Sequence, residues 1–161
     1  MGDAPLLFFD NFADLFRVHY PRVVRALVLT GADPALAEDI AQEAFARTLG
    51  HWRRVRGGTN PPGYVFRIAF RLLRSRGLVP TTALDEEMAA AGPAVADAAS
   101  ARVDIGRALA LMPPRRRACV VLCWLLDAPT GEAAEALGIA AGTVRKQLEL
   151  ARRQLSGVIE A

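Results

Sequence analysis

Residues 130–155 read TGEAAEALGIAAGTVRKQLELARRQL, and two helical patterns meet in this stretch at a glycine. The first pattern carries small and apolar side chains on one face: Ala133, Ala134 and Leu137. Gly138 supplies the backbone freedom that a tight turn needs, and Ile139 is expected to fill the corner. The second pattern has one apolar stripe at spacings of four, three and four: Val144, Leu148, Ala151 and Leu155. The stretch therefore predicts a helix-turn-helix.

The other face of the second helical pattern is polar and mostly cationic. Its side chains are Thr143, Arg145, Lys146, Gln147, Glu149, Arg152 and Arg153. Base edges are read by polar tips and phosphates are held by cations, so this face is predicted to contact DNA in the major groove. A helical hairpin with a solvated basic face is the alternative interpretation.

Composition favours a helical protein of one domain or two small ones. The chain has 161 residues, of which 52% are hydrophobic, many of them alanine. No apolar run approaches the ~18 residues of a membrane span, and MGDAPLLFFD lacks the basic flank of a signal peptide, so we expect a cytoplasmic protein without membrane insertion. Cys119 and Cys123 lie four apart in a helical run, which predicts small core residues and neither a disulfide nor a metal site.

Charge is strongly segregated along the chain. Residues 1–46 have a net charge of −4, residues 47–76 of +8, residues 77–104 of −4 and residues 105–161 of +3. Two basic blocks separated by acidic ones indicate a polyanion that the protein touches at two places.

The N-terminal third predicts three helices. The first, over residues 7–20, has an aromatic and apolar stripe: Phe8, Phe12, Leu15, Phe16 and His19. Pro21 is expected to end it and to open a second helix over 22–29. Asp33 and Pro34 then predict a capped helix that runs to about residue 52. Its inward side is expected to be Ala37, Ile40, Ala41, Ala44, Phe45, Thr48 and Trp52.

On this third helix, Asp39, Gln42 and Glu43 share a separate face. Acidic residues near a helix start are partly explained by the helix dipole. Their spacing is equally consistent with a docking surface for a basic partner helix.

The next segment combines cations with aromatic rings. Residues 53–63 are rich in glycine and proline and predict a loop that carries Arg53, Arg54 and Arg56, with Val55 among them. Residues 64–76 regain helical period. Their outward side chains are expected to include Tyr64, Phe66, Arg67, Phe70, Arg71, Arg74 and Arg76. Cations hold phosphates and rings stack on unpaired bases, so the mixture predicts binding of melted nucleic acid. The alternative is an amphipathic helix whose aromatic residues are all core.

The remaining segments predict a linker and two helices. Residues 79–103 are rich in alanine and acids without a steady stripe, which predicts a linker with at most short helical pieces. A helix over 104–112 is expected to stop at Pro113, and Pro114 to open a helix over 115–126. The inward residues of the latter are predicted to be Ala118, Val121, Leu122 and Leu125.

Four motifs in this order resemble the small two-domain extracytoplasmic-function sigma factors of bacterial RNA polymerase. DPALAEDIAQEAFAR (33–47) resembles the family's polymerase-binding helix, and YVFRIA (64–69) its promoter-melting and minus-ten helix. LMPPRRRACVVL (111–122) and EAAEALGIAAGTVRKQLELARRQL (132–155) are similar to its minus-thirty-five domain.

The resemblance implies an all-α protein with two helical domains, residues 1–77 and 104–161, joined by a flexible linker over 78–103. It implies a promoter-specificity subunit, not an enzyme, that needs no cofactor or metal. Its partners would be promoter DNA and core RNA polymerase, contacted at the β′ coiled coil and the β flap, with an anti-sigma factor as a further candidate. Asp39, Gln42 and Glu43 would bind the polymerase. Minus-ten contacts would come from Arg53, Arg54, Val55, Arg56, Tyr64, Arg67, Phe70, Arg71 and Arg74.

Two departures from the family pattern concern its pocket for a flipped base. Val55 stands where the family often has an aromatic residue, and Arg71 where it often has asparagine. A guanidinium cannot present the paired donor and acceptor of an amide, so we expect an unusual minus-ten preference. Pro129 and Ala140 replace family serine caps, which predicts fraying of the C-terminal domain off DNA.

Rival hypotheses explain less of the chain. A helix-turn-helix repressor leaves the acidic and the aromatic helices without a role. A sigma-like adaptor that binds polymerase or an anti-sigma protein without normal minus-ten reading remains open. An enzyme is disfavoured because the sequence shows no cluster of histidine, cysteine and carboxylates and no phosphate-binding glycine loop.

Overall fold

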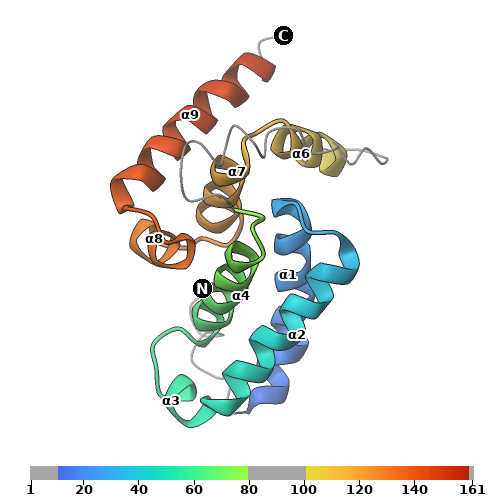
Figure 1. The fold of residues 1–161 in the computed structure, drawn as a ribbon, viewed down its shortest axis with the longest axis vertical. Coiled ribbons are helices and arrows are strands. Elements are labelled where there is room, and N and C mark those ends of the chain that lie inside the picture. Colours follow the sequence, from blue (N-terminus) through green and yellow to red (C-terminus); the bar gives the residue numbers. More distant parts are fainter. Residues whose placement is uncertain (1–10, 80–100, 160–161) are drawn as a thin grey trace.

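The computed structural model describes residues 11–79 and 101–159, and these residues form helices and no strand (Figure 1). The helices within residues 12–75 make one helical unit, and those within residues 101–159 make a second unit beside it. The predicted all-α, two-domain fold class is confirmed. The predicted linker falls almost entirely outside the described residues.

α1 (Phe12–Thr30) is one helix that continues through Pro21, so the predicted break there is wrong. The Asn11 side chain caps it by accepting a hydrogen bond from the Asp14 N–H at 2.9 Å. Pro21 is exposed, so water can satisfy the carbonyl that loses its partner. The buried stripe meanwhile continues across the proline: Leu15, His19, Val23, Ala26 and Leu27. Packing of that stripe outweighs one missing hydrogen bond.

α2 (Pro34–Gly50) begins as predicted, because the Asp33 side chain accepts from the Leu36 N–H at 2.9 Å and Pro34 occupies the first turn. Its buried residues are those predicted up to Thr48, while Trp52 is half-buried beyond its end. α3 (Trp52–Arg56) is a single helical turn within the segment predicted as a loop. α4 (Pro61–Ser75) starts three residues earlier than predicted, where the Asn60 side chain caps it through the Gly63 N–H.

Aromatic rings hold the end of the first unit together. The Phe12 ring lies edge-on to both Phe45 and Trp52, with centroids 6.1 and 5.7 Å apart. Phe16 stacks on Tyr20 at 4.7 Å and meets the edge of Phe45. These contacts confirm the predicted core role for the stripe from Phe12 onward, although Phe16 keeps 39% of its surface exposed. Phe8 lies outside the described residues.

The second unit begins with α6 (Ala101–Ala110), three residues earlier than predicted. α7 (Pro114–Val120) opens on Pro114 as expected and runs into η2 (Val121–Leu125), a π-helical turn. The Leu126 N–H bonds to the Val121 carbonyl five residues back, which delays the helix by about one residue. Leu125 is therefore 40% exposed, and its predicted inward position is wrong.

The helix-turn-helix is confirmed: α8 (Thr130–Leu137) is followed by α9 (Ala141–Ile159). Gly138 adopts φ 67° and ψ 33°, a left-handed conformation that ends α8 and that glycine tolerates best. The predicted stripes are inward, with Leu137 and Val144 fully buried. Cys119 is buried and Cys123 half-buried, and neither is disulfide-bonded.

The two units pack against each other, with α4 of the first unit at the boundary (Figure 1). One side of α4 rests on α1 and α2, and another side contacts α8. α1 also touches α6, α7 and η2. A helix with neighbours on two sides buries more of its circumference than a surface helix. Several predicted site residues on α4 are therefore less exposed than the sequence pattern suggests.

Candidate nucleic-acid and polymerase interfaces

The acidic face of α2 points away from the core. Asp39 and Gln42 are exposed, while the inward side of the same helix is fully buried. Glu43 is half-buried and accepts from Arg47 at 2.7 Å, with the Arg76 guanidinium 3.8 Å away. Asp39 and Gln42 thus offer an exposed carboxylate and amide on a rigid helix, while Glu43 is already neutralised by basic neighbours.

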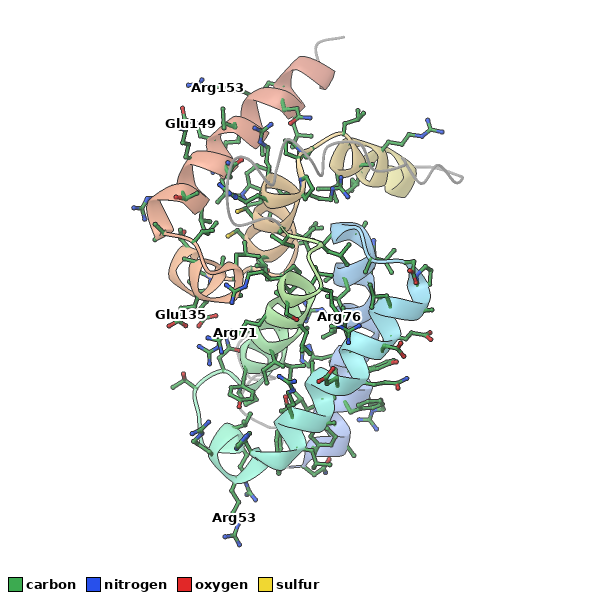
Figure 2. The ribbon with its side chains drawn as sticks, viewed as in Figure 1. Arg53, Arg71, Arg76, Glu135, Glu149 and Arg153 are labelled. Carbon is green, nitrogen blue, oxygen red and sulfur yellow. The ribbon has the colours of Figure 1, made fainter. Side chains whose placement is uncertain are left out.

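The short helix α3 presents its arginines to solvent. Arg53, Arg54 and Arg56 are exposed, and Arg53 projects from the end of the molecule (Figure 2). Val55 differs, because its side chain is only 5% exposed. It anchors the turn to the unit and does not project with the arginines, and its predicted place in a minus-ten pocket stays a prediction. Val55 contributes an apolar wall instead.

A hollow of about 360 Å³ opens beside that wall. It is lined by Arg54, Val55, Gly58, Thr59, Asn60, Gly63, Tyr64, Arg67 and Glu132. The Arg67 guanidinium lies 5.7 Å from the centre of the Tyr64 ring, a cation–π distance. The hollow therefore combines an aromatic wall, hydroxyl and amide groups and two guanidinium groups, which together can hold a planar polar group such as a base.

The prediction that Phe70 contacts minus-ten DNA is not supported by its position in the structure. Its side chain is fully buried, and Phe66 is 8% exposed. The Phe66 ring meets the edge of His19 on α1, with centroids 6.3 Å apart. The buried Phe70 ring is not available to stack on a base. Tyr64 lines the hollow beside Val55, and Phe66 lines a different hollow, between the two units.

The arginines of α4 have different surroundings. Arg71 is exposed (Figure 2). Arg67 donates to the Glu135 carboxylate of α8 at 2.9 Å. The guanidinium of Arg74 lies against Gly138, so closely that a Cβ at that glycine would overlap it. The sequence carries no signal for these contacts, since the partners are more than sixty residues apart.

On α9 most of the predicted contact residues are available. Arg145 and Lys146 are exposed and Thr143 is half-buried. Glu149 accepts from Arg153 at 2.7 Å, and the Arg152 guanidinium lies 5.6 Å from the Trp124 ring.

Gln147 is the exception on α9, because it is 8% exposed and faces the interior. Arg116 Nε donates to its side-chain oxygen at 3.2 Å, so its predicted contact with DNA is wrong. The spacing already contained the signal: Val144, Gln147, Leu148 and Ala151 follow the i, i+3, i+4, i+7 pattern of one face.

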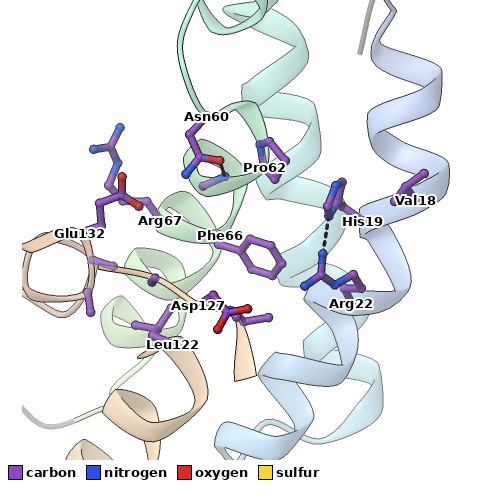
Figure 3. A pocket seen from close by; sticks show the side chains of 15 residues that line it. Val18, His19, Arg22, Asn60, Pro62, Phe66, Arg67, Leu122, Asp127 and Glu132 are labelled. Carbon is purple, nitrogen blue, oxygen red and sulfur yellow. Dashed lines mark hydrogen bonds between the residues drawn. The ribbon is translucent and has the colours of Figure 1, made fainter. Parts of the chain in front are cut away.

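A second hollow, of about 470 Å³, lies between the two units (Figure 3). Residues of α1, α4, η2 and α8 line it, among them Arg22, Phe66 and Glu132. Arg22 donates to His19 Nδ1 at 3.3 Å. Burial, with a smaller contribution from the Arg22 charge, lowers the pKa of His19 to about 4, so the ring is neutral at pH 7. His19 is therefore a structural residue.

Across residues 11–79 and 101–159, no three histidine, cysteine or acidic side chains gather in a way that would hold a metal ion. None of the helices in these ranges is long and apolar enough to cross a membrane.

Comparison with known proteins agrees with this geometry. The family model Sigma-70 region 2 matches residues 15–76, and Sigma-70, region 4 matches residues 102–155. The chain is 33% identical over 154 residues to the RNA polymerase sigma-E factor of Streptomyces coelicolor, covering 90% of this chain and 84% of that protein. It is 32% identical to the ECF RNA polymerase sigma factor SigE of Mycolicibacterium smegmatis, covering 90% of this chain and 60% of that protein. The chain belongs to the extracytoplasmic-function sigma factors.

The fold of this sigma factor also resembles that of solved relatives. The sigma factor RpoE, from a co-crystal structure with the anti-sigma factor NepR of Bartonella quintana, superposes with a TM-score of 0.68 at 18% identity. The match covers 93% of this chain and 97% of that one. The arrangement of both helical units is thus shared with a protein of very different sequence.

Proposed function

We propose that this sigma factor directs core RNA polymerase to promoters, and that three of its surfaces divide the task. The observation that carries the proposal is the separation of one acidic surface on α2 from two basic surfaces, on α3 with α4 and on α9, within the matched family regions. Residues 1–77 would form the polymerase-binding and minus-ten domain and residues 104–161 the minus-thirty-five domain, joined by 78–103.

The acidic surface of α2 is the proposed polymerase contact. Asp39 and Gln42 are exposed and can accept hydrogen bonds from a basic helix pair such as the β′ coiled coil. Glu43 is engaged by Arg47, so its contribution to docking would be smaller. A further contact of the C-terminal domain with the β flap would follow from the same family role.

The minus-thirty-five contact is assigned to α9. Arg145 and Lys146 lead because they are exposed near the start of the helix, followed by Thr143, Arg152 and Arg153. Glu149 is paired with Arg153 and would act by orienting that arginine. Modest affinity would suffice, because a second tethered contact raises the effective concentration.

The minus-ten contact is assigned to the hollow beside Tyr64 and to the exposed arginines. Arg53, Arg54 and Arg56 would hold phosphates, and Tyr64 with Arg67 would hold an unpaired base. Val55 would form the wall of this pocket. Arg71 offers only donors, so we expect a minus-ten preference that differs from that of an asparagine-bearing relative.

Run-off transcription with purified core polymerase tests the role as a whole. We expect initiation at promoter DNA selected by the reconstituted holoenzyme, and loss of initiation when Asp39 and Gln42 are both replaced by alanine. Open-complex formation by the natural chain and by Arg71→Asn on minus-ten variants then tests base preference. Identical preference of the two proteins would contradict the assignment of Arg71.

An adaptor that binds polymerase or an anti-sigma protein without reading promoters is the alternative, and the ion pair that already engages Arg67 with Glu135 is the observation that favours it. Binding to core polymerase without specific initiation would establish the adaptor. In either role the chain makes and breaks no covalent bond and acts in the cytoplasm, where polymerase and chromosome are found. The solved relative in complex with NepR supports testing an anti-sigma partner.

A further inference from the structure

We infer that Arg116 of α7 is a positioning residue for promoter reading. Its guanidinium fixes the rotation of α9 about the helix axis, and this rotation determines which α9 side chains meet the minus-thirty-five bases. Arg116 itself lies on the inward side of α9, since it binds the buried Gln147. The inference rests on the proposed minus-thirty-five role of α9.

The apolar stripe of α9 attaches the helix to its own unit but defines its rotation loosely. Val144 and Ala151 are fully buried, and Leu148 is 9% exposed. α7 and α8 contribute small side chains to the same core, among them Ala118 and Ala133. Hydrophobic attraction has no preferred direction, so burial of this stripe tolerates small rotations of the helix.

Hydrogen bonds from Arg116 remove that freedom at one edge of the stripe. Its Nε donates to the Gln147 side-chain oxygen at 3.2 Å, and its Nη1 donates to the Gln154 side-chain oxygen at 2.8 Å. Gln147 and Gln154 are separated by about two helical turns, so both lie on the same edge of α9. Because hydrogen bonds weaken steeply away from their preferred angle, rotation of α9 strains both bonds together.

The Gln154 amide extends the contact to a third segment. Its nitrogen donates to the Leu111 carbonyl, just after the end of α6, at 3.3 Å, while its oxygen accepts from Arg116. An ionised carboxylate or an apolar side chain could not make both bonds. α9 is thereby fixed to α7 and to the turn that precedes α7.

A different contact holds the opposite edge of the stripe. The Arg152 guanidinium lies 5.6 Å from the centre of the Trp124 ring of η2, a cation–π distance. At about 100° per residue, Arg152 and Gln154 fall on opposite sides of the line through Val144 and Ala151. Rotation of α9 in either direction therefore weakens one of the two contacts.

Rotation matters because DNA is contacted by the tips of side chains. A helix with its side chains is about 10 Å wide, so a rotation of about 20° moves a tip by roughly 2 Å. Hydrogen bonds to base edges do not survive such a shift, whereas long cationic side chains can still reach phosphates. Loss of the Arg116 contacts should therefore weaken sequence discrimination more than overall attraction to DNA.

The test uses holoenzyme assembled from purified core polymerase and the full chain, on promoter DNA selected by the natural holoenzyme. Binding is compared between the selected minus-thirty-five segment and a scrambled one, with the minus-ten segment kept constant. Arg116→Lys keeps the charge but replaces the planar fork by one ammonium group, and Gln154→Leu removes both amide bonds without changing the charge. We expect each variant to lower the ratio of the two affinities about 5-fold, as for the loss of one base contact.

Arg107→Lys is the matched control, because Arg107 is an exposed arginine of α6 in the same unit. Its minus-thirty-five ratio should equal that of the natural chain. Discrimination between minus-ten variants, measured with the same holoenzymes, should be unchanged in every variant. A general loss of stability lowers the amount of active holoenzyme but changes neither ratio, so the two ratios separate positioning from folding.

An unchanged minus-thirty-five ratio in both Arg116→Lys and Gln154→Leu would overturn the inference. An equal fall of the minus-thirty-five and minus-ten ratios would overturn it as well, because Arg116 would then not act through α9. The natural holoenzyme is measured first. If it does not distinguish the selected segment from the scrambled one, the proposed minus-thirty-five role of α9 is refuted, a result distinct from a loss that is seen only in the variants.

Discussion

α4 and α9 carry similar sequence patterns, each an apolar stripe backed by basic residues, yet the structure treats them differently. α9 contacts α7 and α8 through the face that carries Val144 and Leu148, and Arg145 and Lys146 remain exposed. α4 packs on α1 and α2 and also contacts α8, so Arg67 and Arg74 meet the neighbouring unit, while Phe66 and Phe70 are buried. An amphipathic pattern identifies the helix face that packs on the protein core. When another helix packs on a different face, it contacts residues that the pattern assigns to solvent.

The largest expected effect on stability comes from replacing Phe70 in α4, which tests whether its ring belongs to the core. If the ring is core, as its complete burial indicates, Phe70→Ala should lower the free energy of unfolding by about 3 to 5 kcal/mol. Tyr64→Ala is the comparison, since Tyr64 lies at the open hollow. It should weaken oligonucleotide binding with a much smaller loss of stability. Urea unfolding followed by circular dichroism measures the free energy of unfolding of both variants. A Phe70→Ala variant that keeps its stability but binds DNA poorly would restore the predicted stacking role of Phe70.

The turn that contacts α4 can be probed at Gly138. Gly138→Ala forces a left-handed conformation on a residue with a Cβ, which costs about 1 to 2 kcal/mol, and the new methyl group also displaces Arg74. Gly131→Ala, within α8 and with open space around it, is the matched control and should not destabilise the protein. Thermal unfolding compares them; equal melting temperatures would mean that the turn is not strained.

The covered side of the molecule should also respond to pH through His19. The pKa of His19 is about 4 in the folded protein and near 6.5 in an unfolded chain, so the unfolded state binds more protons between these values. The stabilisation from a neutral, buried ring is complete above pH 6.5 and is lost as the pH falls toward 4. We expect a loss of about 1 to 2 kcal/mol between pH 7 and pH 5. The loss should be smaller in His19→Gln, measured by urea unfolding at both values.

The smallest expected effects on stability come from alanine substitutions at two adjacent residues of α9, Gln147 and Lys146. Gln147→Ala should lower the free energy of unfolding by about 1 kcal/mol, because Arg116 loses its hydrogen-bond partner. Lys146→Ala should leave stability unchanged and weaken minus-thirty-five DNA binding, reducing the salt-dependence slope by about 1. A reversed outcome, with Gln147 controlling DNA affinity, would return Gln147 to the contact surface.

Sequence patterns located most of the secondary structure because each signal acts over a few residues. Asp33 with Pro34 marked the start of α2, and Gly138 marked the turn of the helix-turn-helix. The failures share a cause. At Pro21, local helix-breaking chemistry was overridden by a continuous buried stripe. At Leu125, a π-helical turn shifted the register by one residue without an obvious signal.

Exposure of the candidate contact residues could be predicted from the sequence wherever it depends only on which face of a helix they occupy. The exposed Asp39 and Gln42, and the exposed Arg145 and Lys146, follow from period alone. Gln147 was assigned to the wrong face although its spacing from Val144 and Ala151 points inward. Val55 and Phe70 required knowledge of which helix lies opposite, which no local pattern contains.

By itself, the sequence determined that this protein is helical, that α2 is capped at Asp33, and that acidic and basic faces are segregated, because these properties depend on neighbours within about one helical turn. The tertiary structure alone decided that α4 packs on α8 of the second unit as well as on α1 and α2, and that Glu135 meets Arg67. Those partners are 68 residues apart, and their contact depends on the packing of whole helices. The same packing determines which of the basic residues are free to meet DNA.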